Sequence, residues 1–156
     1  MNEIERLDFQ LRRSFAGEAW HGPSLLEALT NVTAEAANSR PIPNVHTIWE
    51  IVLHVIATYN LVLRRMHSNA SPLTPEEDWP RIPSATPSSW HDTIEKLQQV
   101  NEQLCKEVVG FNPEKLDQSF AAEPYSAYTQ FIGITQHNLY HAGQIVLLAK
   151  ARLPQI

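Results

Sequence analysis

The sequence has little of several residue types, and each shortage excludes a class of protein. Cysteine occurs once, at Cys105, so the chain can form neither an internal disulfide nor a metal cluster built on several cysteines. Lys and Arg number 12 against 17 Asp and Glu, a net charge of −5 that argues against nucleic-acid binding. No apolar run approaches the roughly 18 residues of a membrane span. Residues 1–13 lack the apolar core of a signal peptide, so we expect a cytoplasmic protein.

Glycine is also scarce, with five residues, whereas the 11 prolines gather in a few places and separate long stretches without breakers. Apolar residues make up 43% of the chain and charged residues 19%, which is enough for a hydrophobic core and too little charge for disorder. The length of 156 residues fits one domain, which we expect to span residues 1–156.

The apolar periodicity of these stretches predicts four long helices and no strand. We expect them at residues 2–16, 48–67, 88–109 and 126–152, with Ser88 or Ser89 capping the third. A shorter helical piece begins near Pro23 and fades before Arg40. Thr47 and Glu50 form a T-x-x-E capping box at the start of the second long helix. The fold class is therefore all-α, a four-helix bundle whose connectivity the pattern leaves open.

Histidine is the residue type that stands out, with seven copies beside the one cysteine. His137 and His141 are four residues apart, so both rings project from one helix face, within a stripe that also holds Ile134 and Ile145. His54 lies in the apolar stripe of the second long helix. Two helices therefore direct histidines toward the interior of the bundle.

Buried imidazoles need hydrogen-bond partners, and a divalent ion can satisfy three ring nitrogens at once. Three histidines leave one coordination position open, as catalytic metal sites do, and such a ligand set suits zinc, nickel, copper or iron(II). The alternative is that each histidine is an ordinary core residue with its own hydrogen bonds. A metalloprotease is excluded because Asn138 stands where the H-E-x-x-H motif requires its glutamate.

The sequence resembles the DinB-like (DinB/YfiT-like) superfamily of metalloenzymes. The two histidine-bearing stretches are the specific part of the resemblance: RPIPNVHTIWEIVLH at residues 40–54 and GITQHNLYHAGQI at 133–145. WHGPSLLEAL at residues 20–29 and EEDWP at 76–80 support it. The family's first metal-binding histidine ends the W-E-x-x-x-H stretch, here His54, and the other two form H-x-x-x-H, here His137 and His141.

The resemblance implies an up-down-down-up four-helix bundle, frequently a homodimer, with a divalent metal ion, commonly nickel or zinc, on these three histidines. Characterised relatives include enzymes that use low-molecular-weight thiols, such as a mycothiol-dependent isomerase and bacillithiol S-transferases. We therefore expect a metal-dependent enzyme, either a thiol S-transferase or a hydrolase, acting on a small molecule. The alternative is a non-catalytic bundle that binds a metal ion or a small ligand. Neither reading involves DNA or a membrane.

The other histidines and a few further polar residues can each be explained by an ordinary structural role, and some also by a role at the site. His46 and His21 are expected at a helix entrance and a bundle end, with a place at the rim of the site as the alternative for His46. His67 and His91 fall at predicted helix ends, where histidine is ordinary. Tyr140 and Gln144 flank the histidine pair and either reach a metal-bound water or complete the packing and hydrogen bonding of a ligand. Cys105 is expected to be an inert buried thiol, so any thiol chemistry would use a cosubstrate.

Overall fold

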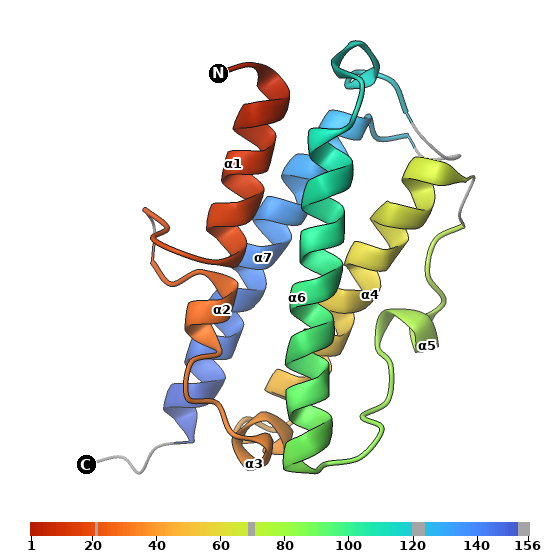
Figure 1. The fold of residues 1–156 in the computed structure, drawn as a ribbon. Coiled ribbons are helices and arrows are strands. Elements are labelled where there is room, and N and C mark those ends of the chain that lie inside the picture. The colour runs from red at the N-terminus through yellow and green to blue at the C-terminus, as the bar shows by residue number, and fades with distance from the viewer. Residues whose placement is uncertain (21, 69–70, 120–123, 153–156) are drawn as a thin grey trace.

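The computed structural model describes residues 1–20, 22–68, 71–119 and 124–152, and every regular element in these ranges is a helix (Figure 1). Four of the helices are long: α1 (Glu3–Phe15), α4 (Ile48–His67), α6 (Pro87–Val109) and α7 (Ala127–Ala151). The short elements are α2 (Leu25–Ala28), α3 (Ala34–Asn38), α5 (Pro75–Asp78) and the 3₁₀ turn η1 (Pro113–Lys115). The expected all-α class is confirmed for the described residues.

The four long helices pack side by side around one hydrophobic core. Helix α1 lies against α6 and α7, and α4 lies against the same two helices. The buried apolar stripes of all four join in a single cluster, with Trp49, Leu97 and Ile145 among its fully buried members. Because α4 and α7 are neighbours, their inward faces meet along the length of the bundle, and this contact positions the histidines discussed below.

The helix boundaries follow the local signals where those signals are strong. Thr47 caps α4 and forms the expected capping box with Glu50, and Ser126 caps α7. The predicted start of α6 was wrong, because Thr86 accepts a hydrogen bond from the Ser89 amide and the helix begins at Pro87. Proline fits this first helical position, since it has no amide hydrogen to leave unpaired.

The helical piece predicted from Pro23 is two short helices rather than one. The break follows α2, where Asn31 adopts a left-handed conformation with φ of 64°. Asparagine tolerates this conformation better than most residues, and it stops a right-handed helix. Thr33 then caps α3 by accepting a hydrogen bond from the Ala36 amide.

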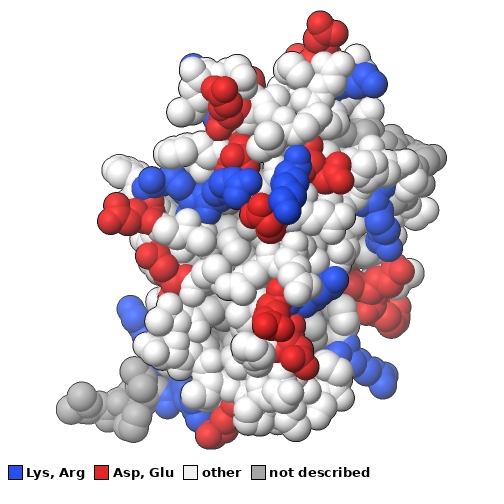
Figure 2. Space-filling model, viewed as in Figure 1, with Lys and Arg blue, Asp and Glu red and all other residues white. Residues whose placement is uncertain are grey.

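The connection between α4 and α6 runs back along the outside of the bundle and carries α5 beside α4 (Figure 1). This long connection therefore brings residues of the EEDWP segment next to the middle of α4. On the face drawn in Figure 2, acidic and basic side chains are interspersed and no broad basic patch is seen. None of the described helices combines the length and the apolar character needed to cross a membrane.

Candidate metal centre

Two neighbouring helices bring the three predicted histidines together. His137 and His141 lie one turn apart on the face of α7 that packs against α4, and His54 faces them from α4. One nitrogen from each ring lies within 4.8 Å of the others, a group that could hold a metal ion. No other such group of three histidine, cysteine or acidic residues occurs in the described part of the chain.

The inner nitrogens of the three rings converge on one point. Nε2 of His137 is 2.9 Å from Nε2 of His54 and 3.0 Å from Nε2 of His141. His141 as a whole residue is 3% exposed, and the side chain of His54 is 12% exposed. The centre is therefore largely shielded from water. Electrostatic interactions in such a shielded place are stronger than at the surface.

The outer nitrogens of two of these rings face oxygen atoms. Nδ1 of His54 is 3.0 Å from both the backbone oxygen and the carboxylate Oδ1 of Asp78. Nδ1 of His141 is 2.7 Å from Oε1 of Gln144. Oxygens of this kind accept hydrogen bonds, so each of these Nδ1 atoms carries the proton. In a neutral imidazole the Nε2 atom then presents a lone pair to the centre.

The three rings have too few protons at Nε2 to place a hydrogen bond between each close pair of these nitrogens. When both rings are neutral, His54 and His141 present lone pairs, and Nε2 of His137 can carry one proton, which it can donate to only one of them. The other close nitrogen pair has no proton between its atoms and repels. A cation accepts all three lone pairs at once, so the donor set fits a divalent metal ion better than it fits a hydrogen-bonded core.

Burial keeps two of these rings neutral. It lowers the pKa of His137 to about 3, with the neighbouring His141 and His54 adding to the effect. It likewise lowers the pKa of His141 to about 4, although the hydrogen bond to Gln144 acts in the opposite direction. Because an imidazole must be neutral to bind a metal, both rings are in the binding form at physiological pH.

A comparison with protein-family models matches residues 19–145 to the model described as the DinB superfamily. The chain belongs to the DinB superfamily. The match runs from before α2 to Ile145 within α7 and includes all three histidines of the centre. Neither the curated proteins nor the solved structures that were compared contain a match to this DinB-superfamily chain.

The most important neighbours of the centre that sequence reasoning missed are Asp78 and Trp79. The Trp79 ring stacks on His54 at 4.2 Å between centroids, and its other face stacks on His46 at 3.6 Å. His46 therefore lies at the rim of the centre, one ring away from His54. The sequence offered only a weak signal, the EEDWP segment. No local pattern indicates that this connection folds back so that Asp78 contacts His54, 24 residues earlier in the chain.

Of the other candidate residues in this DinB-superfamily chain, some contact the centre and others lie at the surface. Gln144 bonds to Nδ1 of His141, whereas the Tyr140 ring stands edge-on to His141 at 5.1 Å and is 66% exposed. His67 and His91 lie at the surface, 3.1 Å from Glu107 and 3.3 Å from Glu95. His21 lies outside the described residues.

The single cysteine is remote from this chemistry. Cys105 is fully buried in α6, and burial raises the pKa of its thiol to about 11. A thiol with so high a pKa is protonated at neutral pH and therefore a poor nucleophile.

Proposed function

We propose that His54, His137 and His141 hold one divalent metal ion, with nickel or zinc as the leading candidates. The observation that carries this proposal is the convergence of three Nε2 atoms whose rings, at His54 and His141, are held by hydrogen bonds at Nδ1. Such outer hydrogen bonds fix the tautomer and the orientation of a metal-binding histidine. The choice between nickel and zinc rests on the family resemblance alone.

We propose further that the bound metal serves a reaction. Three protein ligands leave a coordination position for a water or a substrate, and Asp78 bonds to the outer side of the His54 ring, so it does not fill that position. When bound, the metal would act as a Lewis acid on a water molecule or on a thiol cosubstrate. Transfer of a low-molecular-weight thiol is the chemistry to test first, and hydrolysis the second.

The chain's own residues would contribute orientation and shielding. Asp78 and Gln144 hold two rings, and Trp79 covers one face of His54. Among the described residues, no acidic or basic side chain besides the histidines contacts the Nε2 side, which also suits a non-catalytic metal-binding protein. A metal that exchanges readily and turnover of a thiol with an electrophile would support the enzyme. A fourth ligand from the protein would support the binding protein.

Elemental analysis tests the metal site directly. Protein purified without chelator is expected to hold about one equivalent of metal, as one three-histidine site requires. His137→Ala should lose it, and His91→Ala, at an exposed histidine on α6, should retain it. If the wild type holds no metal above background and takes up neither nickel nor zinc, the site is not a metal centre.

We also propose that residues 1–156 form one domain in which α1, α4, α6 and α7 adopt the up-down-down-up order. The course of the ribbon supports this order, since the connection from α4 to α6 returns to the opposite end of the bundle (Figure 1). The proposed homodimer rests on the resemblance. Its test is the molecular mass in solution.

A further inference from the structure

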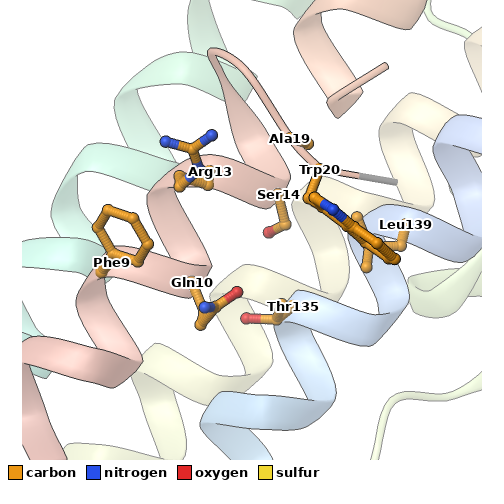
Figure 3. Close-up of a pocket in the computed structure, with 8 residues that line it drawn as sticks. All are labelled: Phe9, Gln10, Arg13, Ser14, Ala19, Trp20, Thr135 and Leu139. Carbon is orange, nitrogen blue, oxygen red and sulfur yellow. The ribbon is translucent and has the colours of Figure 1, made fainter. Parts of the chain in front are cut away.

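A second candidate site lies on the other side of α7, in a groove between α1 and α7 that the residues after α1 close (Figure 3). Its volume is about 430 Å³, within the usual range for a small-molecule site. The groove is lined by Phe9, Gln10, Arg13, Ser14, Ala19, Trp20, Thr135 and Leu139. Thr135 and Leu139 are about 200° around the helix from His137 and His141, so the groove and the metal centre use opposite faces of α7.

The apolar part of the lining is open to water. Trp20 is 98% exposed and Phe9 is 44% exposed. Trp20 and Leu139 both line the groove, and Figure 3 shows Trp20 and Phe9 toward opposite sides of it. An indole that stands almost wholly in water is unusual, because tryptophan is one of the side chains that gain most from burial. A flat apolar group seated in the groove would cover it.

The groove also holds a cation that forms no ion pair in the described part of the chain. Arg13 lies over the Phe9 ring, 5.2 Å from its centroid, and forms no ion pair with an acidic residue in the described ranges. Its neighbour Arg12 contrasts with it, since Arg12 pairs with Asp8 at 2.8 Å and with Glu102 at 3.2 Å. In a chain with a net charge of −5, an unpaired guanidinium beside apolar rings marks a place for an anion.

A third feature lies at the floor of the groove. Thr135 is 9% exposed, and its buried hydroxyl has no hydrogen-bond partner among the described residues. Figure 3 shows this hydroxyl turned toward the side chain of Gln10. Buried hydroxyls are normally paired, so this group is free to bond a polar atom of a ligand that moves the exposed Gln10 side chain aside.

We propose that this groove binds a small monocarboxylate with an aromatic or apolar body. Arg13 would hold the carboxylate, because its planar guanidinium matches the two oxygens, and Trp20 and Leu139 would cover the body. A dianion is disfavoured because Glu18 and Glu27 line the adjoining hollow beside Arg13. A cation is disfavoured by Arg13 itself. The proposal does not depend on the metal centre.

The test is a titration of the protein, as purified and labelled with ¹⁵N, with 3-phenylpropionate. The Trp20 indole and Thr135 amide signals are expected to shift saturably, and the signals of the buried Trp49 should stay in place. The neutral 3-phenylpropionamide lacks the carboxylate, and propionate lacks the aromatic ring. Each should therefore bind at least about tenfold more weakly than 3-phenylpropionate.

Variants separate this groove from the metal centre. Arg13→Gln should weaken binding at least about tenfold, whereas Arg6→Gln, on the same helix but outside the lining, should leave it unchanged. His54→Ala should also retain binding. The proposal is overturned if no signal saturates up to about 10 mM ligand, if the amide binds as well as the acid, or if His54→Ala abolishes binding. The last result would place the carboxylate on the metal instead.

Discussion

At the residue scale, the centre depends on which nitrogen of each histidine carries the proton. Asp78 and Gln144 decide this for His54 and His141, because each places an oxygen at Nδ1. His137 differs, since its Nδ1 is buried without a described partner and no hydrogen bond on that side orients its ring. The centre therefore has two rings held by hydrogen bonds and one held by its surroundings.

Replacement of Asp78 should weaken metal binding without unfolding the protein. Asp78→Asn removes the carboxylate charge at Nδ1 of His54, where loss of an outer partner typically costs about 10- to 100-fold in affinity. The affinity is measured by competition with a chromophoric chelator. Glu76→Gln, an exposed acid in the same short helix, serves as the control and should bind metal like the wild type. Equal affinities for the two variants would show that Asp78 has no such role.

At the element scale, α7 has two inward faces with different tasks. One face carries His137 and His141 toward α4, and the other carries Asn138 toward α1. The Tyr59 hydroxyl donates to Oδ1 of Asn138 at 2.6 Å, and Nδ2 of Asn138 donates to the Ser14 hydroxyl at 2.9 Å. This buried chain of hydrogen bonds links α4, α7 and α1 and fixes how α7 is rotated about its axis.

The Tyr59→Phe substitution should lower the free energy of unfolding by about 1–3 kcal/mol, because it leaves the buried Oδ1 of Asn138 without a donor. Urea denaturation followed by circular dichroism measures this difference. Tyr128→Phe removes a hydroxyl from a tyrosine that is 37% exposed and should change stability little. A Tyr59→Phe variant as stable as Tyr128→Phe would mean that the chain of hydrogen bonds contributes nothing to stability.

At the scale of the whole molecule, a metal ion would join helices that are far apart in the sequence. His54 and His137 are 83 residues apart, and α4 and α7 are also held together by core packing and by the hydrogen bond from Tyr59 to Asn138. A ligand that binds only the folded chain stabilises it in proportion to the logarithm of its concentration. The proposed centre therefore predicts that stability depends on free metal.

Nickel or zinc at 100 times its dissociation constant should raise the free energy of unfolding by about 2.7 kcal/mol, and excess chelator should reverse the gain. The measurement is urea denaturation at several concentrations of free metal. His137→Ala should show no dependence on metal, whereas His91→Ala should behave like the wild type. A gain that persists in His137→Ala would indicate metal binding elsewhere on the chain.

Strong local signals predicted the elements well. The capping box at Thr47 and Glu50 placed the start of α4, and Ser126 marked the start of α7. Weaker signals failed where two neighbouring residues could do the same task, as Thr86 rather than Ser88 or Ser89 caps α6. They failed also where one backbone conformation decides, as the left-handed Asn31 separates α2 from α3. Spacing further predicted that His137 and His141 share a face, because the helical repeat requires it.

The sequence alone thus determined the all-helical class, the bounds of α4 and α7 and the three histidines that face inward. These properties follow from short-range periodicity and capping, which act within a few residues. Only the tertiary structure decided that the three Nε2 atoms meet, that Asp78 and Trp79 return to His54, and that Arg13, Trp20 and Thr135 line one groove. These contacts join residues distant in the chain, and their distances depend on how the helices and connections pack.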